Sequence, residues 1–255
     1  MIDFHSHIVY GVDDGSQSLD SSIKILREAK EAGIDKIILT PHYMEDYYIV
    51  PKLEIKEKID ILREECKKEK IDIELYQGNE IYISNHIDEF LKKDLACSLN
   101  DSRYVLFETP LNIEPSNLIE VIYKIKEMGK VPVLAHPERY AFIQENPNKL
   151  LDLFEMGVLF QSNYGSVIGL YGKNAEKTIK LLLKNNYIHF LGSDVHRKGN
   201  VYPYINDAKN SIIKIIGQEK FDKISDKNIL KVIKDEEIEK EQLHQIKISF
   251  FSKLF

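Results

Sequence analysis

The alternation of short apolar runs with longer helical patterns limits this chain to a small set of folds. Seven runs are typical of parallel strands covered on both faces, because most are continuously apolar. They are residues 2–5, 36–40, 72–78, 103–108, 131–135, 158–162 and 188–192. Helical periodicity lies between them, over residues 18–33, 53–70, 116–129 and 174–186. Repeated β–α units predict a parallel sheet, and seven of them favour a closed or nearly closed TIM-like α/β barrel over a doubly wound sheet.

The length of 255 residues suits one domain spanning residues 1–255, since no internal repeat, linker or shift in composition divides the chain. A formal charge of −6 disfavours a general nucleic-acid binder. The two cysteines, Cys66 and Cys97, form no paired motif, which predicts a reducing, cytoplasmic environment. There is no signal-like N-terminus and no apolar run of roughly 18 residues, so we expect neither secretion nor a membrane span.

Side chains that can bind metals follow six of the seven predicted strands. His5 and His7 alternate at the end of the first, so a strand would project both imidazoles to one side. The others are Asp13, Asp14, His42, Glu80, Glu108, His136, Asp194 and His196. Because the carboxyl ends of barrel strands share one face, we expect all of them to converge. Only the sixth strand offers no strong ligand, because it ends in Gln161 and Ser162 and is followed by Asn163.

Imidazoles and carboxylates without a thiolate predict a site for Zn, Mn or Fe. With one of Asp13 and Asp14 counted, the nine ligands exceed the three or four that one ion needs, so we predict two or three ions that share bridging carboxylates. The spacing alone does not choose between Asp13 and Asp14 as the ligand in "VDDGS".

The motif series "DFHSH…TPH…GNE…FE…HPER…GSDVH" resembles the polymerase and histidinol phosphatase (PHP) family. Its fuller form, with "MIDFHSHIVYGVDDGS" and "LAHPERY", is similar to the manganese-dependent protein tyrosine phosphatases of bacterial capsule and exopolysaccharide operons. The resemblance implies a distorted (β/α)7 barrel of PHP type with divalent ions, Mn foremost and Fe or Zn as alternatives. It also implies a phosphotyrosine protein as substrate, namely a membrane-associated tyrosine kinase of polysaccharide export. The resemblance does not decide whether the protein forms an oligomer.

The resemblance assigns the ligands to three metal positions. One takes His5, His7, Glu80 and Asp194; the second shares Glu80 and adds Glu108 and His136; the third takes Asp14, His42 and His196. The family pattern thus favours Asp14 over Asp13, and Arg139 of "HPER" would bind the substrate phosphate.

One family feature is missing from this chain. A second phosphate-binding arginine is expected several residues after the "SDVH" segment, yet no arginine follows Arg197. We therefore expect either Arg197 or Lys198 to replace it, and favour Arg197. A lysine would bind as a point charge without the bidentate fork of arginine.

Three other functions compete with protein dephosphorylation. They are a small-molecule PHP phosphatase such as histidinol-phosphatase, a non-catalytic metal-binding scaffold of polysaccharide assembly, and an amide hydrolase. The last would usually carry a carboxylated lysine where Glu80 stands. Cys97 and Arg103 also match the C-x5-R spacing of cysteine-based phosphatases, but "CSLNDSR" lacks phosphate-cradling glycines and leads into a strand.

Two further regions carry weaker signals. Residues 234–255 are charged, end in an apolar and basic tip, and predict a helix packed outside the barrel, with docking to a partner or membrane surface as the alternative. Four tyrosines that flank the ligand loops are candidates for a wall against a phosphotyrosine ring: Tyr43, Tyr47, Tyr48 and Tyr140.

Overall fold

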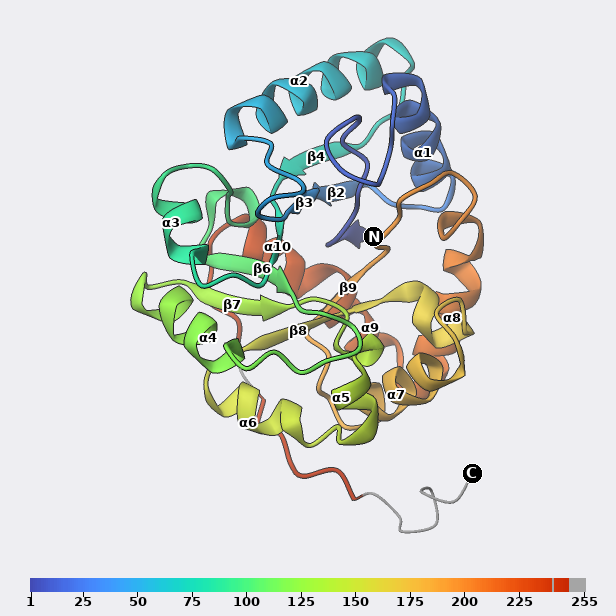
Figure 1. The fold of residues 1–255 in the computed structure, drawn as a ribbon. Coiled ribbons are helices and arrows are strands. Elements are labelled where there is room, and N and C mark those ends of the chain that lie inside the picture. The colour runs from blue at the N-terminus through green and yellow to red at the C-terminus, as the bar shows by residue number, and fades with distance from the viewer. Residues whose placement is uncertain (240, 248–255) are drawn as a thin grey trace.

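The computed structural model describes residues 1–239 and 241–247, and its centre is a curled parallel sheet surrounded by helices (Figure 1). The strands are β1 Ile2–Asp3, β2 Lys36–Leu39, β3 His42–Tyr43, β4 Glu74–Gln77, β5 Glu80–Tyr82, β6 Tyr104–Glu108, β7 Val131–Leu134, β8 Leu159–Asn163 and β9 Phe190–Gly192. They form two parallel sheets, of order β1-β2-β4 and β3-β5-β6-β7-β8-β9. The predicted α/β class with a parallel sheet is confirmed. The two short strands β3 and β5, which follow interruptions at Pro41 and Gly78, were not predicted.

Backbone hydrogen bonds bring the carboxyl ends of the first and last strands together. The Asp194 N–H donates to the His5 carbonyl at 2.8 Å, and the His7 N–H donates to the Val195 carbonyl at 2.9 Å. The residues after β1 therefore lie beside those after β9, although nearly the whole chain separates them in sequence.

Helices cover the outside of the sheet. Their bounds are α1 Leu19–Glu31, α2 Lys52–Lys68, α3 Ile87–Lys92, α4 Leu118–Glu127, α5 Ala141–Glu145, α6 Lys149–Glu155, α7 Lys173–Lys184, α8 Ile205–Ile216, α9 Gln218–Asp222 and α10 Asn228–Ile233. Short helical turns are η1 Leu99–Asp101, η2 Pro137–Arg139, η3 Tyr164–Ile168, η4 Tyr202–Tyr204 and the π-helical η5 Lys223–Lys227. Ser18 caps α1, where its hydroxyl accepts from the Ser21 N–H at 3.2 Å. Among the described residues, no helix combines the length and the apolar character needed to cross a membrane.

Strand alternation separates an inner from an outer core. In β2, Ile38 belongs to the inner cluster, whereas Ile37 and Leu39 pack against the helices. The inner cluster contains Phe4 and Phe190, whose rings stack with centroids 4.4 Å apart. The inner apolar cluster does not extend to the carboxyl ends of the strands. The inward-facing side chains at those ends are polar, and they meet there.

The predicted C-terminal helix is wrong for residues 234–239 and 241–247, which contain no helix. Asp235, with φ 58°, interrupts the helical path after α10. The following backbone is bound by side chains instead: the Tyr104 hydroxyl donates to the Glu236 carbonyl at 2.8 Å and accepts from the Ile238 N–H at 3.1 Å. Asn148 binds both the N–H and the carbonyl of Ile246, at 2.7 and 3.1 Å. The apolar and basic tip, residues 248–255, lies outside the described residues.

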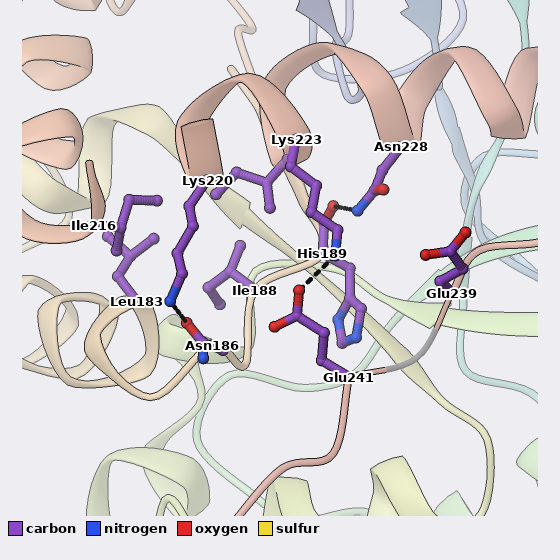
Figure 2. Close-up of a pocket in the computed structure, with 11 residues that line it drawn as sticks. Leu183, Asn186, Ile188, His189, Ile216, Lys220, Lys223, Asn228, Glu239 and Glu241 are labelled. Atoms are coloured by element: carbon purple, nitrogen blue, oxygen red, sulfur yellow. Dashed lines mark hydrogen bonds and ion pairs between the residues drawn. The ribbon is translucent and has the colours of Figure 1, made fainter. Parts of the chain in front are cut away.

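A small pocket lies under this segment, at the amino ends of the strands (Figure 2). Lys223 pairs with Glu241 at 2.5 Å, and the Asn228 amide donates to the His189 carbonyl at 3.0 Å. Its cavity of about 40 Å³ suits water and little else. His189, just before β9, belongs to this end of the sheet and not to the end where the candidate ligands meet.

Candidate metal centre

The buried carboxylate of Glu80, the first residue of β5, lies among four imidazoles. Its Oε2 is 3.2 Å from Nε2 of both His5 and His7 and 3.0 Å from Nδ1 of His42. Its Oε1 is 2.9 Å from Nε2 of His136. Burial alone would raise the pKa of Glu80, but the imidazoles, His5 first, hold it well below its usual value. Glu80 is thus ionised, and its carboxylate contacts imidazoles that come from the ends of three other strands.

Asp194 follows β9 and faces the same point from the opposite side. Its Oδ1 is 3.4 Å from His7 Nε2 and 3.8 Å from His5 Nε2. Burial raises the pKa of Asp194 and the imidazoles, His5 first, lower it, so that it lies far below its usual value. Asp194 and His136 have φ of 55° and 31°, which is the left-handed region that side chains rarely adopt. Backbone strain of this kind gathers at functional sites.

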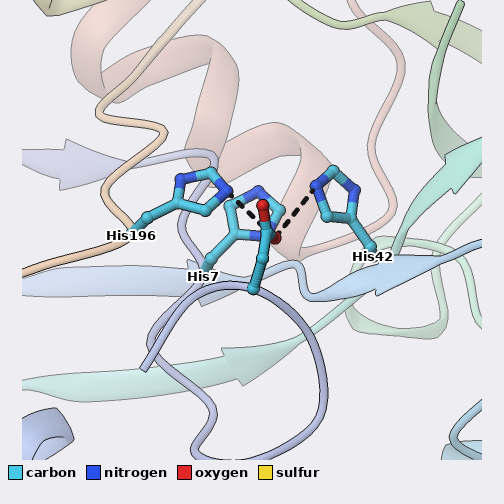
Figure 3. Close-up of side chains that lie close together, drawn as sticks. His7, His42 and His196 are labelled. Carbon is cyan, nitrogen blue, oxygen red and sulfur yellow. Dashed lines mark ion pairs between the residues drawn. The ribbon is translucent and has the colours of Figure 1, made fainter. Parts of the chain in front are cut away.

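A second group of ligands lies nearer the surface. Figure 3 shows the rings of His7, His42 and His196 turned toward a common point. Asp14 Oδ1 lies there, 3.6 Å from His42 Nε2 and 3.5 Å from His196 Nε2. The hydrogen bond from His196 is the main reason that the pKa of Asp14 falls to about 2. His42 connects the two groups, because its Nδ1 faces Glu80.

Glu108 completes the cluster. Alternation in β6 carries Tyr104, Leu106 and Glu108 on one face, which places the carboxylate at the open end of the inner core. Glu108 Oε1 is 3.1 Å from His42 Nδ1, and its Oε2 is 3.8 Å from His136 Nε2. The structure therefore brings all nine predicted ligands into one continuous cluster: His5, His7, Asp14, His42, Glu80, Glu108, His136, Asp194 and His196.

Asp13 and Asp14, which the spacing could not separate, occupy different places. Asp13 lies behind His7 and accepts from its Nδ1 at 2.7 Å and from the His42 N–H at 3.0 Å. Gly15 makes this turn possible, since a Cβ there would lie 2.2 Å from the His7 carbonyl oxygen. Asp13 thus fixes the His7 ring so that Nε2 faces Glu80, while Asp14 reaches into the outer group.

The residues of this cluster fit divalent cations. Among the described residues, the buried Glu80 Oε2 and His42 Nδ1 have no hydrogen-bond partner although they face each other. Buried polar atoms are normally satisfied, and an ion between them would do so. Three sets of ligand atoms lie within 4.8 Å of one another: His7, Asp14, His42 and His196; His5, His7 and Glu80; and His42, Glu80 and Glu108. Nitrogen and oxygen donors without sulfur suit Zn, Mn or Fe.

An open cavity of about 420 Å³ adjoins the cluster. Arg139 and Arg197 both line it, together with Tyr171 and Asp194, whereas Lys198 is not among the described lining residues. The Arg139 guanidinium donates to Asp194 Oδ2 at 2.7 Å and lies 4.7 Å above the centre of the Tyr171 ring. Two guanidinium groups beside a cluster of imidazoles and carboxylates form a place for an anion.

Glu138 is a supporting residue that sequence reasoning missed. This fully buried carboxylate accepts from the Ser162 hydroxyl at 2.7 Å, the Asn163 N–H at 2.9 Å and the Ser166 hydroxyl at 2.7 Å. It therefore anchors the turn that presents Arg139. The signal that could have found its partners is the polar sequence "QSN" at the end of an apolar strand.

The four predicted wall tyrosines separate into two pairs. Tyr43 and Tyr140 are buried and unavailable to a substrate, since Tyr43 packs on Phe90 and the Tyr140 hydroxyl accepts from a backbone N–H. Tyr48 stacks against His42 with centroids 5.8 Å apart, and Tyr47 is exposed. Only the second pair lies where a ligand could reach.

The C-x5-R alternative is excluded by geometry. Cys97 is buried, and burial raises the pKa of its thiol to about 12, so it is not a thiolate near neutral pH. Its Sγ contacts the Asn79 amide oxygen at 3.3 Å. The exposed Arg103 guanidinium is bound instead to Asp235, with which it pairs at 3.1 Å.

Comparison with known proteins places the chain in a family. A family model described as capsular polysaccharide synthesis, CpsB/CapC, matches residues 1–234. The chain belongs to the CpsB/CapC family. Relatives include the tyrosine-protein phosphatase CpsB of Streptococcus pneumoniae, 32% identical over 241 residues that cover 92% of this chain and 99% of the relative. Another is the tyrosine-protein phosphatase YwqE of Bacillus subtilis, 37% identical over 196 residues, 77% of each chain.

Solved structures agree with this membership. A structure from a study of B. subtilis YwqE and S. pneumoniae CpsB, described as unique metal-dependent tyrosine phosphatases, matches with a TM-score of 0.91 and 32% identity. The match covers 97% of this chain and 100% of that one. A histidinol phosphate phosphatase from Lactococcus lactis matches with a TM-score of 0.57 and 17% identity over 84% and 93% of the two chains, which shows a shared fold alone. These matches confirm the predicted resemblance of this chain to the capsule-operon tyrosine phosphatases.

Proposed function

We propose that this CpsB/CapC protein is a metal-dependent protein tyrosine phosphatase. The observation that carries the proposal is the contact of Glu80 with His5, His7, His42 and His136, next to a cavity with two arginines. The names of its relatives, tyrosine-protein phosphatases, point to the same reaction.

The ligand sets that we propose are those that the family resemblance implies, and the contacts within the cluster are compatible with them. His5, His7, Glu80 and Asp194 would hold one divalent cation, and Glu80, Glu108 and His136 would hold a second. Asp14, His42 and His196 hold a third, and His42 also lies close enough to Glu108 to contribute to the second set. Two or three ions, with Mn as the physiological metal and Fe or Zn as alternatives, fit these donors.

Divalent cations in this cluster would provide an activated water near neutral pH and neutralise part of the phosphate charge. Arg139 and Arg197 orient the phosphate from the cavity and stabilise the charge that spreads over its oxygens. The oxygen of such a water would attack phosphorus in line with the tyrosine oxygen, so that one phosphorus–oxygen bond forms as the bond to tyrosine breaks. The tyrosine oxygen would leave with a proton taken from solvent, and no phosphoenzyme would form. Asp13 holds His7 in its ligand orientation throughout.

The finer architecture that we infer is a distorted (β/α)7 barrel. Strands β2 and β3 act as one strand broken at Pro41, and β4 and β5 as one broken at Gly78. In support, the Gly78 N–H donates to the Leu39 carbonyl at 2.8 Å, and the Glu80 N–H donates to the Pro41 carbonyl at 3.1 Å across the two breaks. The cluster then lies at the carboxyl ends of the strands, where barrel enzymes build their active sites.

The proposed substrate is a phosphotyrosine protein in the cytoplasm, namely a membrane-associated tyrosine kinase of polysaccharide export. The family description, capsular polysaccharide synthesis, supports this setting. Tyr47 is exposed, and the half-buried Tyr48 stacks on His42 of the cluster. Aromatic side chains in these positions suit a phosphotyrosine that projects from a protein surface.

The test compares three substrates on one preparation loaded with Mn²⁺: p-nitrophenyl phosphate, a phosphotyrosine peptide and histidinol phosphate. We expect the peptide to have a kcat/KM well above that of histidinol phosphate. The reverse order would favour the small-molecule phosphatase. A protein that binds metal and turns over none of the three would favour the non-catalytic scaffold.

A further inference from the structure

Strand β8 contributes none of the proposed ligands, yet its polar end lies against two of them. Alternation places Leu159, Gln161 and Asn163 on the inner face, because Leu159 belongs to the inner core cluster. Gln161 and Asn163 are fully buried. Two uncharged amides buried at this depth are costly unless each donor and acceptor is used.

Both amides are used in one hydrogen-bond chain between two proposed ligands. Asn163 Nδ2 donates to Asp194 Oδ2 at 2.8 Å, and Gln161 Nε2 donates to Asn163 Oδ1 at 2.9 Å. Gln161 Oε1 then faces His5 Nδ1 at 2.9 Å. We call His5, Gln161, Asn163 and Asp194 the amide chain.

The chemistry of the amide chain sets its direction. The Asp194 carboxylate can only accept, so the Asn163 atom that faces it must be the amide nitrogen. This leaves the Asn163 oxygen as the acceptor for the Gln161 nitrogen. The Gln161 oxygen is then the atom that faces His5, and because it can only accept, His5 Nδ1 must carry a proton.

A protonated Nδ1 leaves Nε2 as the ligand atom of the neutral ring. His5 Nε2 is the atom 3.2 Å from Glu80 Oε2. At the other end, Asn163 shares Asp194 Oδ2 with Arg139, which keeps Oδ1 turned toward His5 and His7.

Gly192 makes room for this arrangement. It pairs with Asn163 in the β8–β9 register. A Cβ at Gly192 would lie 2.7 Å from His5 Cβ and 3.0 Å from Gln161 Nε2. Any side chain there would therefore displace His5 or Gln161.

We propose that Gln161 and Asn163 are positioning residues that set the tautomer of His5 and the orientation of Asp194 through the amide chain. The proposal rests on the proposed function, since both ends are proposed metal ligands. The Asp13 carboxylate orients the neighbouring His7 ring in the same way, through its Nδ1. One imidazole is therefore held by a carboxylate and the other by an amide oxygen. Outer partners of this kind change metal affinity by about 10–100-fold when they are removed.

The test measures Zn²⁺ affinity and the protonation of the His5 ring in the full-length protein. Gln161→Met keeps the length of the side chain and removes both hydrogen bonds, so we expect affinity to fall by about 10–100-fold. Gln161→Glu keeps an acceptor for His5 and loses the donor to Asn163, so it should recover part of the affinity. The control is Gln77→Met, which removes a strand glutamine bonded to the Lys52 carbonyl and should leave affinity unchanged.

Nitrogen NMR of histidine-labelled protein reads the tautomer directly and needs no variant. In the Zn²⁺-loaded wild type we expect the His5 proton on Nδ1. In Gln161→Met we expect this proton to be no longer fixed on one ring nitrogen. A wild-type His5 protonated on Nε2, or Gln161→Met with wild-type affinity, would overturn the proposal. A wild type that binds no divalent cation would instead overturn the proposed function, and the spectrum of the metal-free protein would still report whether Gln161 holds a proton on Nδ1.

Discussion

Arg139→Ala should remove substrate binding energy while the proposed metal ligands stay in place. The guanidinium lines the open cavity, and its side chain is 24% exposed, so a phosphate can reach it. It also binds Asp194 Oδ2, but that oxygen accepts from the Asn163 amide at 2.8 Å as well, and the substitution does not remove this contact. Asp194 should therefore remain oriented toward His5 and His7.

The size of the effect follows from the type of contact. A hydrogen bond to a charged group contributes about 1.5–3 kcal/mol, which corresponds to a loss of about 10- to 150-fold in kcat/KM. Arg139→Lys should recover only part of this loss, because an ammonium cannot bind two phosphate oxygens as a planar fork.

The assay is kcat/KM on a phosphotyrosine peptide in excess Mn²⁺, together with metal analysis of the same samples. Arg27→Ala is the matched control, since Arg27 forms an exposed ion pair with Glu69 on the helical surface. A near-wild-type kcat/KM for Arg139→Ala, or a loss that follows the metal content alone, would refute the phosphate-binding role.

Three further predictions concern other residues. Arg197→Ala should lower kcat/KM by a similar factor and Lys198→Ala should not, because of these two neighbours only Arg197 is a described lining residue of the cavity. The opposite result would assign the missing arginine's role to the lysine. His136→Ala or Asp194→Ala should abolish turnover with little change in circular dichroism, and retained turnover would remove them from the ligand set. Cys97→Ser should keep full activity, because burial holds its pKa at about 12 and it is not a nucleophile; an inactive variant with normal metal content would contradict this.

The proposed ligands could be predicted because their signal is local. His5, His42 and His136 each follow an apolar run, and the rule that parallel strand ends share a face needs no further structure. The short strands β3 and β5 were missed, because each lies after the end of a predicted apolar run and has only two or three residues.

The supporting residues could not be predicted, because their roles depend on neighbours distant in sequence. Gln161 and Asn163 are uncharged amides whose partners, His5 and Asp194, lie in the segments that follow β1 and β9. The segment after Asp235 has a helical composition, yet its backbone is bound by Tyr104 and other side chains of the barrel. The sequence alone does not show whether tertiary hydrogen bonds will override the local preference for a helix.

The central claim is that hydrolysis depends on ions bound between Glu80 and its surrounding ligands. Its most direct test strips the protein with a chelator and titrates Mn²⁺ back, while turnover of a phosphotyrosine peptide and the bound metal per chain are measured together. We predict that turnover disappears with the metal and returns as two or three ions bind. Full turnover in the metal-free protein would contradict the claim.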